Sequence, residues 1–217
     1  MITTSRLAHP HNPTYPRPMG IKSIQHHKVG LTWVMDDGMQ RASHALVDGD
    51  DVWLIDPVDE GEAIERAMGL GRPRAVIQLL DRHNRDCETL AERLGIPWER
   101  VPGNLRGTPF EVVEVIKKNR WKEIALRWLE RDALVVAEAV GTAPLFALGR
   151  GAVGVHPLLR LTPPKALVGI DPGMLLVGHG APLKSDAAAS LRTALARSRS
   201  DIPRLLMSIP GAMRGRL

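Results

Sequence analysis

The 217-residue sequence contains a single cysteine, Cys87, so an internal disulfide framework is excluded. It also lacks an apolar run long enough for a signal peptide or a membrane-spanning helix. We therefore expect a cytoplasmic protein with a reduced thiol and no membrane partner. The hydrophobic share of 44% is ordinary for a globular chain and excludes disorder of the whole chain.

Aromatic residues make up only 4% of the chain, and no glycine-rich phosphate loop follows an apolar segment. A nucleotide-binding fold is therefore not expected. The net charge is +5, and arginines are concentrated toward the C-terminus without aromatic residues between them. We interpret these arginines as a solvated helix face and a basic tail, so nucleic acid is not expected as a partner.

The composition divides the chain into three parts. Residues 1–24 are rich in proline and form a predicted N-terminal arm, in which His9 and His11 are interpreted as solvated side chains. Residues 25–203 form one predicted domain, because no change in composition divides them. Residues 204–217 form a predicted basic C-terminal tail. The oligomeric state is left open.

Residues 75–98 (AVIQLLDRHNRDCETLAERLGIPW) combine three structural signals. An apolar run predicts a buried strand, and the polar residues 81–86 predict a loop. Leu90 and Leu94 then share one face of a predicted helix that stops at Gly95. A strand, a polar loop and a helix in this order place the loop at the carboxyl end of a sheet, where α/β proteins usually carry their functional side chains.

Three other apolar segments end in a residue suited to a functional site. VWLIDPV carries Asp56, ALVVAEAVG carries Glu138, and LLVGHG carries His179. Asp56 is equally suited to cap a helix, and Glu138 to pair with an arginine. The glycines on both sides of His179 leave its imidazole unobstructed, which favours a site role over a core role.

Together these segments resemble the metallo-β-lactamase superfamily over residues 25–185. In that family an apolar strand ends in a His-x-His-x-Asp-His loop, a helix follows, and a late Gly-His-Gly turn supplies a further ligand. The resemblance implies an α/β fold with an αββα sandwich architecture. When Asp86 and Cys87 are laid on the closing Asp-His pair, Arg82 and Asn84 occupy the two earlier histidine positions.

This alignment implies a degenerate metal motif. The first metal of the family depends on three histidines, of which two are replaced, and no histidine occurs between positions 83 and 156 to supply the third. The positions that remain would hold one zinc-like ion through Asp86, Cys87, Glu138 and His179. Asp56 and Asn84 would orient neighbouring groups without touching the ion.

A metal-free pocket is the alternative, because the guanidinium of Arg82 would stand where the family binds a cation. Asp86 and Glu138 would pair with it, and Arg82→Ala would then cost about 3 to 5 kcal/mol by leaving buried carboxylates unpaired. Such a pocket would bind a small anionic molecule. The residues expected to contact the anion are Arg82, His83 and Arg85, with His179 in the same lining.

Two functions follow from these alternatives. The protein is either a non-enzymatic, anion-binding pseudoenzyme without a cofactor, or a hydrolase of ester, thioester or phosphodiester bonds with one zinc-like ion. The sequence favours the metal-free interpretation and leaves open whether the protein is an enzyme. A third hypothesis pairs Cys87 with His179 as a nucleophile and its base, with the helix N-terminus lowering the pKa of the thiol.

Overall fold

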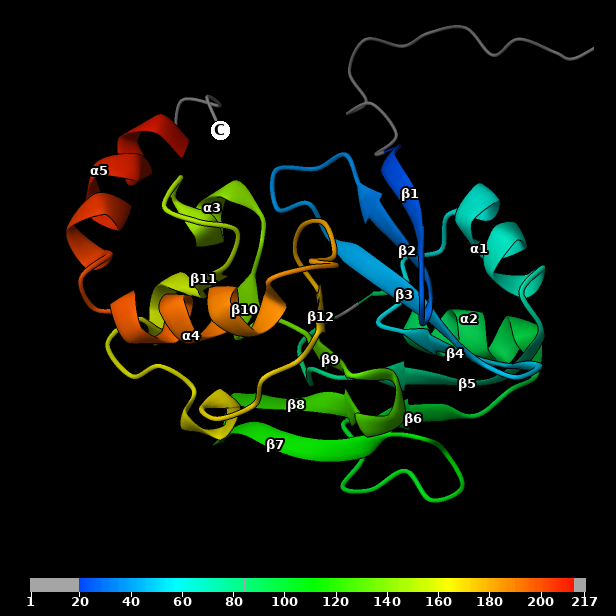
Figure 1. Ribbon diagram of the computed structural model, residues 1–217. Helices are drawn as coiled ribbons and strands as arrows, with labels where there is room; N and C mark the ends of the chain where they lie inside the picture. The colour runs from blue at the N-terminus through cyan, green and yellow to red at the C-terminus, as the bar shows by residue number, and fades with distance from the viewer. Residues whose placement is uncertain (1–19, 84, 213–217) are drawn as a thin grey trace, which may run out of the picture.

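Two β-sheets form the centre of the molecule (Figure 1). The computed structural model describes residues 20–83 and 85–212. The larger sheet has the strand order β1-β2-β3-β4-β5-β6. Its first four strands form an antiparallel meander, whereas β4, β5 and β6 run parallel. The bounds are β1 Ile21–His27, β2 Gly30–Met35, β3 Ala42–Asp48, β4 Asp51–Ile55, β5 Arg72–Gln78 and β6 Trp98–Arg100.

The smaller sheet has the strand order β12-β9-β8-β7. Here β12 and β9 run parallel, and the other neighbours are antiparallel. A separate ribbon pairs β10 with β11. The bounds are β7 Glu111–Lys118, β8 Trp121–Trp128, β9 Ala133–Val136, β10 Val140–Gly141, β11 Gly154–Val155 and β12 Met174–Val177.

Helices lie on the outside of both sheets. The α1 and α2 helices pack on the larger sheet, and α4 packs on β11 and β12. The α2 helix ends as the sequence predicts, with Gly95 at φ +66°, a conformation that favours glycine. The bounds are α1 Gly61–Met68, α2 Cys87–Leu94, α3 Pro144–Ala147, α4 Ala187–Arg197 and α5 Ile202–Ala212, with short 3₁₀ segments η1 Leu129–Arg131, η2 Pro157–Leu159 and η3 Lys165–Leu167.

Two hydrophobic clusters fill the spaces between these layers. One lies between the larger sheet and α1 and α2, and includes Trp33 and Leu54. The other joins the two sheets to α4, and includes Trp128 and Leu191. The order of layers is therefore helix, sheet, sheet and helix, as the sequence predicts.

The two sheets are joined by backbone hydrogen bonds near the ends of their strands. Leu80, just after β5, forms a bridge with Glu123 of β8. The N–H of Ala42, at the start of β3, donates to the carbonyl oxygen of Gly178, which follows β12. These links bring polar side chains from both sheets to one place.

The ends of the described chain are more regular than the composition suggests. Strand β1 begins at Ile21, so the last residues of the expected arm belong to the sheet, while residues 1–19, including His9 and His11, lie outside the described part. The α5 helix takes up most of the expected basic tail. No helix in residues 20–83 and 85–212 is long and apolar enough to cross a bilayer.

Candidate metal centre

Four functional side chains follow four different strands. Asp56 comes directly after β4, and His83 lies in the loop after β5. Glu138 follows β9 and His179 follows β12 in the smaller sheet. Strand β4 is parallel to β5, and β9 is parallel to β12. The carboxyl ends of the two strands in each pair therefore place their residues at the same edge of the sheet.

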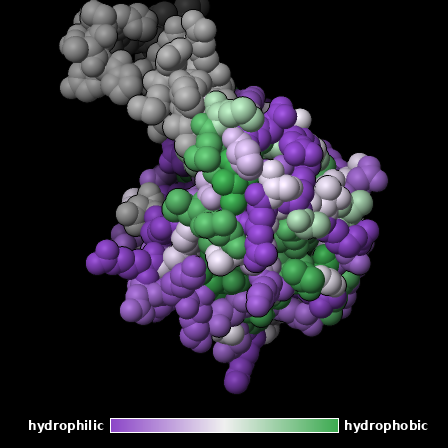
Figure 2. Space-filling view, turned by 90° about the vertical axis from the view of Figure 1, so that its left-hand side faces the viewer, coloured by the Kyte–Doolittle hydropathy of each residue, from purple (hydrophilic) through white to green (hydrophobic). Residues whose placement is uncertain are grey.

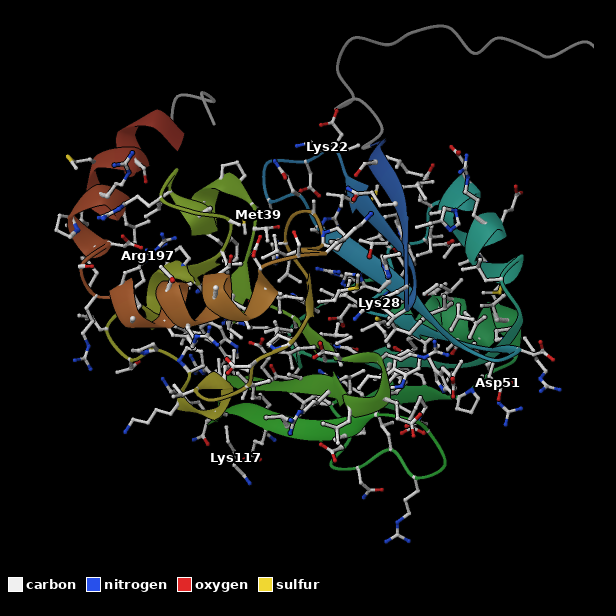
Figure 3. The ribbon with its side chains drawn as sticks, in the orientation of Figure 1. Lys22, Lys28, Met39, Asp51, Lys117 and Arg197 are labelled. Atoms are coloured by element: carbon white, nitrogen blue, oxygen red, sulfur yellow. The ribbon has the colours of Figure 1, made fainter. Side chains whose placement is uncertain are left out.

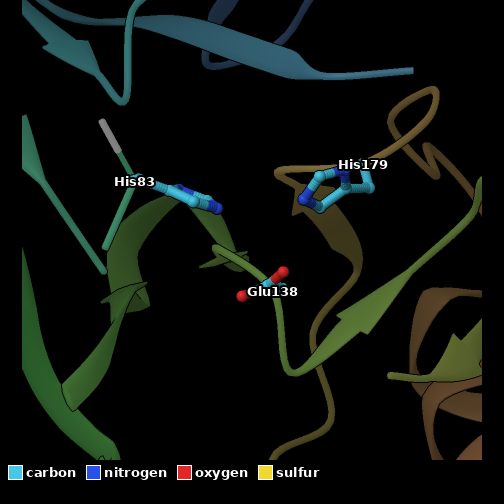
Figure 4. Close-up of side chains that lie close together, drawn as sticks. All are labelled: His83, Glu138 and His179. Carbon is cyan, nitrogen blue, oxygen red and sulfur yellow. The ribbon is translucent and has the colours of Figure 1, made fainter. Parts of the chain in front are cut away.

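Three of these side chains converge. One ligand atom from each of His83, Glu138 and His179 lies within 4.8 Å of the other two. Figure 4 shows the imidazole rings turned toward each other, with the carboxylate of Glu138 between and below them. The three side chains are largely shielded from water, with exposed fractions of 9% for His83 and 15% for Glu138, and His179 is buried.

Each imidazole is held by its Nδ1 atom. His83 Nδ1 lies 3.1 Å from Asp56 Oδ2, and His179 Nδ1 lies 3.1 Å from the carbonyl oxygen of Met39, a residue labelled in Figure 3. Carboxylate and carbonyl oxygens only accept here, so each Nδ1 carries a proton, and in the neutral form of each ring Nε2 carries the lone pair. This fixed tautomer is what a metal-binding imidazole requires.

The Nε2 atoms of His83 and His179 are both buried and have no hydrogen-bond partner. A buried polar atom without a partner costs free energy, and native proteins contain few of them. Two such atoms beside one carboxylate are therefore unusual. They fit a divalent cation, because the cation would supply the partner that both lone pairs lack.

The electrostatics put two of the three groups, Glu138 and His179, in their metal-binding forms. Burial acts to raise the pKa of Glu138, but the hydrogen bond from His156 and electrostatic interactions with His156, His83 and Arg82 lower this pKa to about 2. Burial and the charge of Arg85 lower the pKa of His179 to about 4. At neutral pH the site therefore presents an ionised carboxylate and a neutral imidazole, the forms that bind metals.

Glu138 also contacts two basic side chains. Arg82 Nη2 lies 3.3 Å from Glu138 Oε2, and His156 Nε2 lies 3.5 Å from Glu138 Oε1. The guanidinium of Arg82 stacks on the ring of Trp121 at 3.8 Å from the ring centroid. His156 lies directly before η2, and no local pattern of the sequence links it to Glu138, so only the folded chain brings the two side chains together.

The expectation that Arg82 anchors a buried ion-pair network is wrong in one respect. Its side chain is 41% exposed and has a single contact with Glu138. Exposed ion pairs of this kind contribute little to the free energy of unfolding. In addition, His156 stays beside Glu138 when Arg82 is removed.

We therefore expect Arg82→Ala to lower the free energy of unfolding by less than about 1 kcal/mol, measured by urea denaturation. This value replaces the 3 to 5 kcal/mol that a buried network implied. A loss of about 3 kcal/mol or more would show that Arg82 is the main counterion of the site after all.

Arg85 is placed differently from the expected anion-binding role. Its Nη1 donates to the carbonyl oxygens of Ala42 and Asp56, and its Nη2 donates to that of Gly178 at 2.9 Å. The guanidinium is therefore occupied by backbone oxygens from β3, β4 and the turn after β12. It holds the two sheets together at the centre, and both of its Nη groups are engaged by backbone oxygens.

Asp86 and Cys87 are not brought together with Glu138 and His179. The carboxylate of Asp86 is exposed and accepts a hydrogen bond from the N–H of Asp59. Cys87 is 1% exposed and packs in the cluster under α1 and α2. The predicted four-ligand set is therefore not assembled. Asn84 lies outside the described residues.

The hypothesis of a nucleophilic Cys87 is also wrong. Burial raises the pKa of its thiol, and the nearby carboxylates of Asp56 and Asp86 act in the same direction. The position at the start of α2 does not compensate for this desolvation. A buried neutral thiol is inert, so Cys87 belongs to the core.

Glu123 is a component that the sequence did not reveal. It is completely buried, and its Oε1 accepts hydrogen bonds from the N–H groups of Glu138 and Ala139, each at 2.8 Å. Its Oε2 accepts from the indole N–H of Trp121. Glu123 thus fixes the backbone that carries Glu138. Its signal in the sequence is an acidic residue at an inward position of an apolar strand.

Comparison with known proteins identifies the fold. No protein-family model matches the sequence, and no curated protein matches it. The structure is similar to that of a metallo-β-lactamase from Erythrobacter litoralis, with a TM-score of 0.55 and 10% identity over 85% of this chain and 96% of that chain. It is also similar to a diflavin flavoprotein A 5 fragment from Nostoc sp. PCC 7120, with a TM-score of 0.61 and 13% identity over 85% and 98%.

A third solved structure, TTHA1623 in a di-iron-bound form, has a TM-score of 0.52 and 17% identity over 72% of this chain and 94% of that chain. These likenesses show that the chain has the metallo-β-lactamase fold, and the predicted αββα architecture is confirmed. At such low identities the likeness carries the fold and not the chemistry.

Proposed function

We propose that the protein binds one divalent cation through His83, Glu138 and His179 and hydrolyses an ester, thioester or phosphodiester bond beside it. The observation that carries this proposal is the pair of buried, partnerless Nε2 atoms that lie close to an ionised carboxylate. Two histidines and one carboxylate are a ligand set used by catalytic zinc sites and by non-haem iron sites. Three protein ligands also leave a coordination position open.

Residues around the proposed ligands would have separate roles in positioning them and in binding substrate. Asp56 and the carbonyl of Met39 orient the two imidazoles, and Glu123 fixes the loop that carries Glu138. Arg82 lies at the exposed rim, where it can bind an anionic part of a substrate. When bound, an ion in such a site acidifies a water molecule and polarises the bond to be cleaved.

Metal content provides the test. Protein purified without chelator, offered zinc, manganese and iron and then dialysed, is expected to retain close to one ion per chain by elemental mass spectrometry. Glu138→Gln removes the negative charge at nearly constant shape, and His179→Ala removes one imidazole. Each is expected to weaken metal binding by more than about 100-fold and to abolish turnover of nitrophenyl ester or phosphodiester substrates.

The matched control is His26→Ala, which removes an exposed histidine of β1. It should leave the metal content and the turnover unchanged. The proposal would be overturned if the wild type retained no metal, or if Glu138→Gln and His179→Ala both retained as much metal as the wild type.

A metal-free anion-binding pseudoenzyme is the second candidate. It is favoured by Arg82, because its guanidinium lies 3.3 Å from Glu138 and already balances the charge of that carboxylate. In that case the wild type retains no metal, and a small anion protects it against unfolding through Arg82. For either function we propose a cytoplasmic location, which the single buried and unpaired Cys87 supports.

A further inference from the structure

A second group of charged side chains surrounds Asp201, between α4 and α5. Asp201 is 1% exposed. Its carboxylate lies 3.1 Å from Arg197 Nε, 3.4 Å from Arg160 Nη1 and 3.5 Å from Arg150 Nη1. One carboxylate thus faces three guanidinium groups, so the cluster has an excess of two positive charges.

Backbone contacts explain part of this arrangement but not its charge. Arg160 Nη2 donates to the carbonyl oxygen of Phe146, and Arg197 Nη2 donates to that of Val153, each at 2.7 Å. Carbonyl oxygens satisfy hydrogen-bond donors without adding negative charge. Arg160 is 1% exposed, and its Nε and Nη1 atoms remain buried without a hydrogen-bond partner. A positive charge held away from water, such as that of Arg160, is costly unless an anion compensates it, and this cluster shares one carboxylate among three arginines.

A cavity of about 190 Å³ opens beside two of these arginines. Arg150 and Arg197 line it together with the hydroxyl-bearing Ser190 and Thr193, and none of its lining residues is acidic. Arg150 is 48% exposed, so part of its guanidinium is accessible from water. Figure 3 labels Arg197 beside α4, and Figure 2 shows this face of the molecule, where hydrophilic residues border a hydrophobic strip.

The loop over Arg197 is shaped to leave room for its guanidinium. Gly151 has φ +141°, a backbone conformation that favours glycine. A Cβ atom at this position would lie 2.8 Å from Arg197 Nη1. The absence of a side chain at position 151 therefore keeps the guanidinium at the wall of the cavity.

We propose that this cavity binds a small, doubly charged oxyanion of the phosphate type, either free or as a phosphate monoester. Guanidinium groups match the geometry of phosphate oxygens, and two negative charges would balance the excess on the cluster. The hydroxyl group of Ser190 can donate a further contact, whereas that of Thr193 donates to the carbonyl oxygen of Ala189. The lining shares no residue with the metal centre, so the two sites are separate.

Titration calorimetry with inorganic phosphate and with phenyl phosphate tests the site at constant ionic strength. The protein used is the metal-free His179→Ala variant, so that the metal centre cannot contribute. We expect saturable binding of one anion per chain. Arg150→Gln, which changes a rim residue, and Thr193→Asp, which places a carboxylate in the lining, should each weaken binding at least about tenfold.

The matched control is Arg192→Gln. Arg192 lies on α4, as Thr193 and Arg197 do, but it pairs with the exposed Asp171. Arg192→Gln in the His179→Ala background should therefore bind the anion as tightly as His179→Ala alone. Tighter binding of phenyl phosphate than of phosphate would identify a monoester as the ligand, and the reverse would identify free phosphate. No saturable binding, or unchanged binding in both Arg150→Gln and Thr193→Asp, would overturn the proposal.

Discussion

Replacing Arg85 by alanine is expected to lower the free energy of unfolding by about 3 to 5 kcal/mol. The guanidinium donates to three carbonyl oxygens, those of Ala42, Asp56 and Gly178, which belong to both sheets. Hydrogen bonds from a charged donor contribute more than neutral ones, and their loss leaves the oxygens without partners. Urea denaturation of the metal-free protein measures the effect without a contribution from bound ions.

Two variants sharpen this measurement. Arg85→Lys keeps the charge, but an ammonium group cannot reproduce the planar fork that reaches three oxygens, so most of the loss should remain. Arg82→Ala, in the same loop, serves as the matched control because its contact is exposed. Equal losses for Arg85→Ala and Arg82→Ala would contradict the role assigned to Arg85.

The second large effect is a loss of stability in mild acid through His44. This histidine is 2% exposed, and its Nδ1 lies 2.8 Å from the hydroxyl of Thr32. Burial, with the positive charges of His27 and Arg85, lowers the pKa of His44 to about 3, although Asp56 opposes the shift. In the unfolded chain the pKa returns to about 6.5.

The direction of the pH effect on stability follows from whether the folded or the unfolded chain binds the proton on His44. Between pH 6.5 and about 3 the unfolded chain carries a proton on His44 and the folded chain does not, so acid favours unfolding. This one group should remove about 1.4 kcal/mol of stability for each pH unit in that window. Burial also lowers the pKa of His27 to about 4, so the total slope of the wild type should be steeper.

Urea denaturation at a series of pH values from 7 to 4.5 measures the slope. His44→Gln has no titrating group at this position, so its slope should be smaller than that of the wild type by close to one proton. The comparison depends on slopes, and it remains valid if the variant is less stable at every pH. Identical slopes would show that His44 is protonated in the folded protein.

Most of the fold follows from local patterns in the sequence. The strand before residue 79 and the helix that ends at Gly95 are both present. Turn residues and apolar periodicity determine these elements locally. The C-terminal helix α5 was instead interpreted as a tail from residue 204 onward, because the arginines of residues 204–217 were given more weight than the apolar residues 205–207.

The site was predicted less completely. Glu138 and His179, which follow apolar strands, lie beside His83, and the imidazole of His83 contacts Asp56. Whether these side chains hold an ion stays a prediction. His83 was assigned to anion binding, because the alignment through Asp86 and Cys87 placed the ligand positions on either side of it.

The loop at residues 81–86 explains this difference. A loop has no periodicity, so its sequence does not reveal which side chains point inward. In the structure Arg85 turns inward to bind carbonyl oxygens, His83 turns to Asp56, and Asp86 faces solvent. Glu123 and His156 reach the site from strands and turns distant in sequence, and no local pattern encodes such contacts.

The origin of the three candidate ligands has a consequence for the life of the protein. His83 follows a strand of the larger sheet, whereas Glu138 and His179 follow strands of the smaller one. An ion shared by these side chains would fasten the layers to each other, and at 1,000 times its dissociation constant it would add about 4 kcal/mol to the free energy of unfolding. Metal starvation of the cell would then shorten the lifetime of the protein as well as stop its chemistry.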